Sequence, residues 1–237
     1  MSYRSQVGNE VRRNFWSNPN QTWGDVARGV TDESDNTRKL NNTRNSVSSF
    51  YSFQLSGTLS KNQSFAGRTF DLMGDLIVPS GITLKIESTA SLNLNGYNIR
   101  CTGSGLIIKN GDVIGYTNFA KYGNDYKGFF PSSVSIAQIL AWSSSGWNIV
   151  INSGAYNENS HLNVSSGRAL NLKPNVTLNF SGSYKLNVFG SLFSLGTSGQ
   201  PVTINGQNYS RSGFSNAMVD IKSGGTANIQ YTNFINS

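Results

Sequence analysis

Short apolar runs, separated every few positions by Gly, Ser or Asn, recur along most of the chain. The clearest series occupies residues 74–115, where most runs alternate between apolar and polar positions, as half-buried β-strands do. The strands that it predicts are 76–78, 82–86, 92–94, 99–101 and 106–108. The same spacing returns later, with runs at 171–180, 186–188, 192–193 and 202–204. Each run is too short to form an ordinary hairpin sheet with its neighbour.

A recurring series of short strands with small residues at the corners is typical of a solenoid, in which each coil buries its apolar side by stacking on the next. The series begins with runs at 55–59, 64–67 and 69–72. We therefore predict an all-β fold, a parallel β-helix over residues 55–237. Strands should pair in parallel between successive coils, with Ile, Leu, Val and Phe inside and hydrogen-bonded Asn ladders at the corners.

Three segments resemble the coils of a known family: IVPSGITLKIESTASL, LFSLGTSGQPVTI and DIKSGGTANIQYTNF. They are similar to the repeats of bacterial right-handed parallel β-helix proteins, of the pectate-lyase-like superfamily and the secreted surface-protein type. The resemblance covers about residues 55–237. It implies a right-handed coil and an extracellular or cell-surface location. Because such coils serve enzymes, adhesins and spacers alike, it implies the fold rather than the function.

A non-repetitive passage, residues 116–159, interrupts the series. Apolar residues at three- and four-residue spacing predict one short α-helix inserted near 133–142. The passage resembles the element by which these β-helices cover or restart a solenoid, although Ala155 stands where Thr is usual. Tyr156 and Glu158 are then candidates for a ligand contact. The interpretation that we favour places them in a strand end and turn that pin the helix to the next coil.

Residues 1–54 differ in kind from the rest, with scattered aromatic side chains in a polar sequence. We predict an irregular N-terminal segment that caps the solenoid or belongs to the edge of a preceding module. Trp16 and Trp23 are the side chains expected to pack over the open end of the solenoid.

The formal net charge is +7 and the isoelectric point is about 9.6, which raises the question of nucleic-acid binding. No run of Lys or Arg exceeds two residues and no stacking motif accompanies these side chains, so we expect no specific nucleic-acid partner. Scattered, solvated basic residues are the favoured interpretation, and weak attraction to an anionic cell surface or an acidic polysaccharide is the second. With only 13% charged residues, the composition also argues against intrinsic disorder.

The single cysteine, Cys101, leaves no internal disulfide, and its place in an alternating strand predicts an inert core thiol. No stretch is apolar over the length of a membrane-spanning helix, and the first residues do not resemble a signal peptide. The strand pattern runs to residue 237 without a closing cap, so we expect the chain to be part of a longer one. The alternative is a cytosolic protein.

The acidic residues that catalysis would require are scattered. Pectate-lyase-type chemistry needs a carboxylate cluster for Ca²⁺ with a basic residue nearby, and Asp71 and Asp75 are the candidates to meet in space. Glycoside hydrolysis needs two facing carboxylates, for which Asp112 with Asp75 is a geometric option. His161 is the only histidine and points to neither a multi-histidine metal site nor a catalytic triad. We therefore predict no catalytic, metal-binding or cofactor-binding residues, and no cofactor.

Three functions stay open. The favoured one is a non-catalytic structural or adhesive module of a secreted or cell-surface protein, binding glycans weakly along a face with Tyr, Trp and Asn. The second is a polysaccharide lyase or glycoside hydrolase of the pectate-lyase-like group. The third is a viral tail-spike-type glycan-binding β-helix, which would imply a trimer. The expected partners are a polysaccharide or another cell-surface protein.

Overall fold

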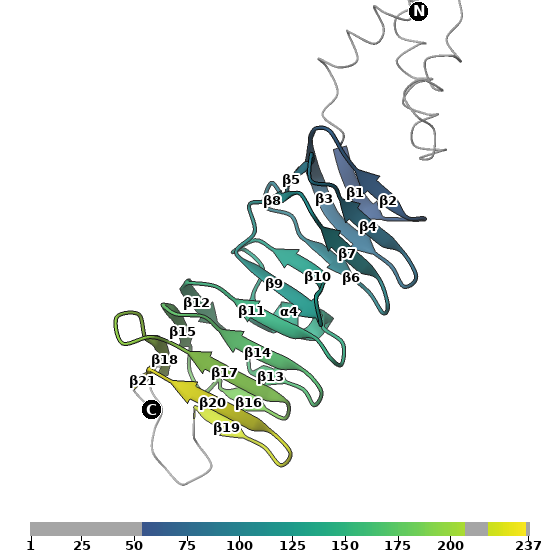
Figure 1. Ribbon diagram of the computed structural model, residues 1–237. Coiled ribbons are helices and arrows are strands. Elements are labelled where there is room, and N and C mark those ends of the chain that lie inside the picture. The colour runs from purple at the N-terminus through teal and green to yellow at the C-terminus, as the bar shows by residue number, and fades with distance from the viewer. Residues whose placement is uncertain (1–53, 207–217, 236–237) are drawn as a thin grey trace, which may run out of the picture. The chain divides into compact units, whose positions relative to one another are not determined.

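A computed structural model describes residues 54–206 and 218–235 of the chain. They all belong to the second of the two units into which the chain divides, Phe53–Ser237. Strands in parallel stacked sheets form a β-solenoid of about 7 turns with one helix, which confirms the predicted fold class (Figure 1). The right-handed sense of the coil remains a prediction. The irregular segment predicted at 1–54 lies outside the described residues, except that the first strand begins at Gln54.

The first group of coils, which we call the N-terminal stack, contains strands β1 to β8. Their bounds are β1 (Gln54–Thr58), β2 (Gln63–Phe65), β3 (Thr69–Val78), β4 (Thr83–Ile86), β5 (Ser91–Asn93), β6 (Ile99–Cys101), β7 (Leu106–Lys109) and β8 (Asp112–Ile114). Successive coils pair in parallel, so that Leu84 lies beside Ile107 and Leu92 beside Val113. Strand β3 turns a corner, because its first half pairs with β5 and its second half with β6.

The second group, the C-terminal stack, has three faces that repeat from coil to coil. Face A consists of β11 (Asn148–Ile151), β14 (Ala169–Leu172), β17 (Ser191–Leu195) and β20 (Thr226–Gln230); face B of β12 (Gly154–Glu158), β15 (Val176–Phe180), β18 (Val202–Gly206) and β21 (Thr232–Ile235); face C of β13 (Leu162–Val164), β16 (Leu186–Val188) and β19 (Val219–Ile221). Every pairing within these faces is parallel. Figure 1 shows the faces as successive layers of short arrows.

Alternation in the sequence decides which side chains enter the core. In β15, Val176, Leu178 and Phe180 are fully buried, whereas the two residues between them face outward. Small residues at the corners let successive coils approach. A Cβ atom on Gly190 would lie 2.3 Å from the carbonyl oxygen of Arg168 in the preceding coil, so only glycine fits there.

An antiparallel hairpin that the sequence analysis did not predict joins the two stacks. Strands β9 (Asn118–Tyr122) and β10 (Asp125–Phe130) pair with each other, β10 pairs with β6 and β7, and β9 pairs with β11. The antiparallel pairings of the described residues all involve these two strands. Parallel pairing therefore dominates, as the solenoid prediction requires.

The N-terminal stack and the C-terminal stack bury side chains on opposite faces of the sheet that passes through this hairpin. Directly paired residues project to the same face of a sheet. Phe129 of β10 pairs with Ile99, which lies in the core of the N-terminal stack, and Phe119 of β9 pairs with Phe129. The next residue, Ala120, pairs with Ile149, which lies in the core of the C-terminal stack. Because adjacent residues of a strand point to opposite faces, the two cores lie on opposite sides of one continuous sheet.

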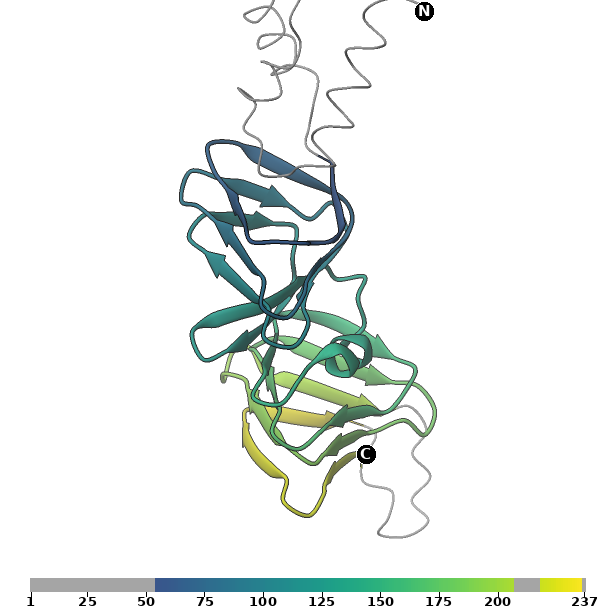
Figure 2. The same ribbon diagram turned by 90° about the vertical axis from the view of Figure 1, so that its right-hand side faces the viewer.

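Each stack has its own cover at this junction. Four aromatic rings on one side of the hairpin contact one another beneath the N-terminal stack: Tyr116, Phe119, Tyr126 and Phe129. On the other side, helix α4 (Ile136–Trp142) packs against β11, β12 and β13 and covers the first coil of the C-terminal stack (Figure 2). The predicted helix is thus confirmed, and it begins at Ile136 because the Ser135 side chain accepts a hydrogen bond from the backbone N–H of Gln138.

Candidate functional site

The outward side of face B is a regular array of uncharged polar groups. Asn157, Asn179 and Asn205 occupy the same position in successive coils, and their amides form a ladder with N–O distances of 3.1 and 3.2 Å. Thr177 and Thr203 form a second row two residues earlier. An Asn ladder was predicted at the corners of the coils, but this one lies along the strands. Asn179, at the centre of the ladder, donates one hydrogen bond to Asn157 and accepts one from Asn205, and these two bonds use only part of its donor and acceptor capacity.

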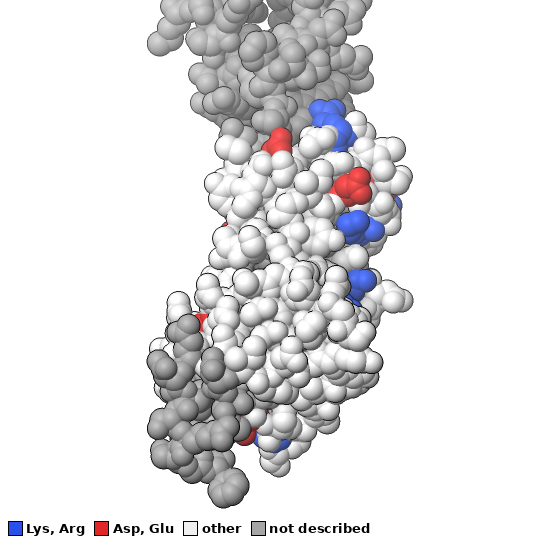
Figure 3. Space-filling view, turned by 90° about the vertical axis from the view of Figure 1, so that its left-hand side faces the viewer, with Lys and Arg blue, Asp and Glu red and all other residues white. Residues whose placement is uncertain are grey.

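Charge is nearly absent from the strands of face B that the structure describes. Among the residues of β12, β15, β18 and β21, the only charged type is Glu158, and its side chain is buried. Figure 3 looks at the left-hand side of Figure 1, where these strands lie, and shows few charged side chains on the part of the C-terminal coils that the grey atoms leave visible. Strands of successive coils are about 4.8 Å apart, so the amides and hydroxyls repeat at that interval. The described residues of face B therefore present neutral hydrogen-bonding groups rather than charges.

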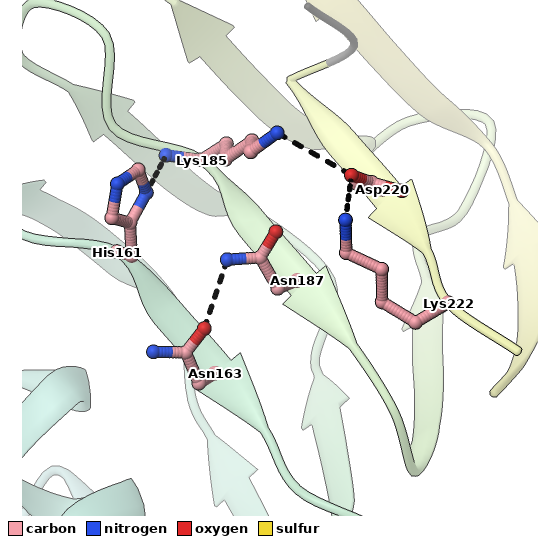
Figure 4. A network of polar contacts seen from close by, with 6 residues as sticks. All are labelled: His161, Asn163, Lys185, Asn187, Asp220 and Lys222. Atoms are coloured by element: carbon pink, nitrogen blue, oxygen red, sulfur yellow. Dashed lines mark hydrogen bonds and ion pairs between the residues drawn. The ribbon is translucent and has the colours of Figure 1, made fainter. Parts of the chain in front are cut away.

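Face C carries a charged network of the C-terminal stack. The Asp220 carboxylate forms an ion pair with the Lys185 ammonium group at 3.3 Å and a second ion pair with the Lys222 ammonium group (Figure 4). The hydrogen bond from Lys222 is the main reason that the pKa of Asp220 is lowered, and Lys185 lowers it further. Beside it, the Asn187 amide donates to the Asn163 carbonyl oxygen at 2.8 Å. The network links three successive coils. Because both ion pairs are partly exposed to solvent, they contribute little to the stability of the fold.

His161 lies at the edge of this network. Its Nδ1 accepts a hydrogen bond from the backbone N–H of Lys185 at 3.2 Å, and its ring meets the Tyr184 ring edge-on. With Nδ1 as the acceptor, the proton of the neutral ring is on Nε2. The contacts of His161 thus join one coil to the next. No group of three or more His, Cys, Asp or Glu side chains that could hold a metal ion occurs among the described residues.

The two carboxylates that were candidates to meet in space contact different neighbours. Asp71 accepts a hydrogen bond from the Asn95 side chain at 3.3 Å, and Asp75 accepts one from the backbone N–H of Asn98 at 3.2 Å. Both partners belong to the next coil. Asp112, the other candidate, is exposed at the start of β8. These acidic residues tie adjacent coils together or face solvent.

Glu87 has the same kind of role. It accepts a hydrogen bond from Ser64 at 2.8 Å in the preceding coil and pairs with Lys85 at 2.9 Å. The hydrogen bond from Lys85, followed by that from Ser64, holds the pKa of Glu87 below its ordinary value. The carboxylate is therefore stabilised in its charged form, which suits a bridge between coils.

Tyr156 and Glu158 attach helix α4 and the hairpin to the first coil of the C-terminal stack. The Tyr156 hydroxyl lies 2.8 Å from the Asn152 carbonyl oxygen and 3.0 Å from Oδ1 of Asn118 on β9. Glu158 is 2% exposed, and its carboxylate accepts hydrogen bonds from the backbone N–H groups of Ile136 and Ala137. These contacts agree with the favoured interpretation of these residues as pins for the helix.

The other end of α4 is held by a cation. Arg168 donates a hydrogen bond to the Leu140 carbonyl oxygen at 3.0 Å, and the Ser143 hydroxyl donates to the same oxygen at 2.6 Å. The Arg168 guanidinium at the last turn complements the helix dipole, and the Glu158 carboxyl group accepts hydrogen bonds from N–H groups of the first turn. The C-terminal stack therefore supplies the side chains that hold both ends of its own cover.

Cys101 is buried, as predicted, and burial raises the pKa of its thiol to about 12. The thiolate, which is the reactive form, is thus disfavoured at neutral pH. None of the helices in the described part of the chain has the length and apolar character needed to cross a membrane.

These features define the class of protein: a parallel β-solenoid of two stacks whose polar side chains link neighbouring coils. Comparison of the chain with protein-family models, with curated proteins and with solved structures gave no match.

Proposed function

We propose that this chain is a non-catalytic structural or adhesive module of a secreted or cell-surface protein, and that it binds glycans weakly on face B. The observation that carries the proposal is the ladder of Asn157, Asn179 and Asn205 beside the Thr177 and Thr203 row. Neutral amides and hydroxyls at a regular spacing match the hydroxyl groups of an extended neutral glycan. Weak binding is expected because each contact exchanges a hydrogen bond to water for one to the ligand.

The positions of the acidic residues support the non-catalytic part of the proposal. General acid–base chemistry needs a carboxylate aimed at a bound substrate. Asp71, Asp75, Glu87 and Asp220 instead contact groups of neighbouring coils, and Glu158 contacts a helix. The likeness of the coils to pectate-lyase-like β-helices, and a location outside the cell, remain parts of this proposal.

Binding to polysaccharides tests the proposal. We expect the full chain to co-sediment with at least one insoluble neutral polysaccharide, and Asn179→Leu to reduce the bound fraction several-fold because it breaks the ladder at its centre. Asn163→Leu is the matched control, since it removes an exposed ladder Asn from face C and should leave binding unchanged. Equal binding by Asn179→Leu and the unsubstituted chain would exclude face B as the binding surface.

An activity assay on the same protein distinguishes a non-catalytic module from a polysaccharide-degrading enzyme. We expect no product from polygalacturonate or other glycans, with or without Ca²⁺. Turnover that is lost in Asp71→Asn or Asp75→Asn would instead support the alternative of a polysaccharide lyase.

A further inference from the structure

An asparagine that precedes a glycine is chemically labile in water, because the glycine leaves its own backbone nitrogen accessible and its backbone mobile. The chain contains three such pairs: Asn95-Gly96, Asn110-Gly111 and Asn205-Gly206. All of them lie within the described residues. The structure places them in different surroundings, so their side-chain amides should differ in lifetime.

The loss of the amide needs no reagent other than water. The backbone nitrogen of the glycine attacks the side-chain carbon Cγ of the asparagine and closes a succinimide ring. The Cγ–Nδ2 bond breaks, and Nδ2 leaves as ammonia with the proton of the glycine N–H. Water then opens the ring at either carbonyl group and leaves an aspartyl or an isoaspartyl residue. The glycine nitrogen must swing toward the side chain, which requires a local opening of the backbone.

Neighbouring coils hold the backbone at two of the three pairs. The N–H of Gly111 donates a hydrogen bond to the Ile86 carbonyl oxygen at 2.9 Å, and a Cβ atom on Gly111 would lie 2.2 Å from a backbone oxygen of the preceding corner. Gly206 is buried in β18, where it pairs with Phe180, and the Asn205 side chain donates to the ladder of face B at 3.2 Å. Opening either pair therefore requires two coils to separate.

Asn95 and Gly96 instead form an exposed turn. Both have positive φ, 49° and 85°, and the N–H of Tyr97 donates to the Leu94 carbonyl oxygen at 2.9 Å, as in a type I′ turn. Among the described residues, no acceptor receives a hydrogen bond from the N–H of Gly96. A Cβ atom on Gly96 would have no heavy atom within 4 Å beyond its two chain neighbours. This turn can open without separating two coils.

The amide of Asn95 ties the turn to the preceding coil. Its Nδ2 donates to Oδ1 of Asp71 at 3.3 Å and to the Leu72 carbonyl oxygen at 3.2 Å, distances at the long end of the hydrogen-bond range. After deamidation, position 95 carries a carboxylate, which accepts hydrogen bonds but donates none. This carboxylate faces that of Asp71, and two like charges repel each other. An attraction between two coils thus becomes a repulsion.

We propose that Asn95 is the site at which this protein deamidates in its folded state, and that the change loosens the tie between two coils of the N-terminal stack. Asn110 and Asn205 keep their amides as long as the solenoid is folded. The site lies in the N-terminal stack, so the proposal is independent of glycan binding on face B.

Peptide mapping by mass spectrometry, after incubation of the full chain at pH 8, tests the site. In the folded protein, the peptide with Asn95 should convert into aspartyl and isoaspartyl forms several-fold faster than the peptides with Asn110 and Asn205. In urea, where the coils are unfolded, all three should convert at similar rates. Equal rates in the folded protein, faster conversion at Asn110 or Asn205, or no conversion at Asn95 while the unfolded chain converts would each overturn the proposal.

The effect on the coils has a separate test. Asn95→Asp, which imitates the product, should unfold at a lower urea concentration than the unsubstituted chain. Combining it with Asp71→Asn restores one amide and one carboxylate with their places exchanged, and should recover most of the loss. A double variant as unstable as Asn95→Asp alone would show that repulsion from Asp71 is not the cause.

Discussion

Leu84→Asp should unfold the N-terminal stack or destabilise it by several kcal/mol. Leu84 is fully buried at the centre of β4, and it lies between Gln63 of the preceding coil and Ile107 of the next. An aspartate there would be desolvated without a partner, and the usual response is a raised pKa together with a large loss of stability. The measurement is the free energy of unfolding from urea titration. Where Leu84→Asp fails to fold, Leu84→Ala provides a measurable loss of about 2–5 kcal/mol.

Thr83→Asp is the matched control for this change. Thr83 is the neighbour of Leu84 and faces outward, so the same carboxylate should cost within about 0.5 kcal/mol. Lys85 also faces outward but is a poorer control, because it pairs with Glu87 at 2.9 Å and an aspartate there would repel that carboxylate. Equal losses for Leu84→Asp and Thr83→Asp would show that the register of β4 is wrong.

Glu158 should make the protein more stable at pH 4.5 than at pH 8, by an amount that Glu158→Gln removes. Burial raises the pKa of its carboxyl from the ordinary value of 4.5 to about 7, although hydrogen bonds from the N–H groups of Ile136 and Ala137 oppose the shift. The folded state therefore holds a proton that the unfolded state has released between these values. The resulting stabilisation is complete below pH 4.5 and is lost as the pH rises through 7, a change of about 3 kcal/mol.

Urea titrations of the unsubstituted protein and of Glu158→Gln at several pH values test this prediction. The difference between their free energies of unfolding cancels the contribution of groups that titrate alike in both. We expect this difference to change by about 3 kcal/mol between pH 4.5 and pH 8. Parallel curves for the two proteins would contradict the assignment of Glu158 as a buried carboxyl that fixes the cover of the C-terminal stack.

The coils could be predicted from the sequence because apolar and polar residues alternate within each single strand. Ile82, Leu84 and Ile86 indicate an inward side without reference to any distant residue, and Ile86 and Leu84 are indeed fully buried. Successive coils repeat the same pattern of strands and corners. The alignment of one strand with the next therefore follows from the similar corners. The same reasoning placed Cys101 inside and predicted the helix near 133–142.

The hairpin could not be recognised by the same criterion, because it does not repeat. A local signal existed in Gly123 and Asn124, a two-residue turn between alternating segments. The sequence of a single strand does not show that the buried side chains lie on one face of the sheet in the first stack and on the other face in the second. This change of face depends on the pairing of Phe129 with Ile99 and of Ala120 with Ile149, residues far apart in sequence. The partners of Asp71 and Asp75 were missed for the same reason, since they belong to the following coil.

The register of face B is the central claim, because the solenoid and the proposed binding face both rest on it. Thr177 and Thr203 are direct partners in the β15–β18 pairing, and adjacent strands at about 4.8 Å bring their Cα atoms within disulfide range. Thr177→Cys combined with Thr203→Cys should therefore form an intramolecular disulfide under mild oxidation, seen as a reducible mobility shift. Cys101 should not compete, since it is buried. Thr177→Cys combined with Asn205→Cys, which is two residues out of register, should remain reduced, and preferential cross-linking of this offset pair would contradict the account.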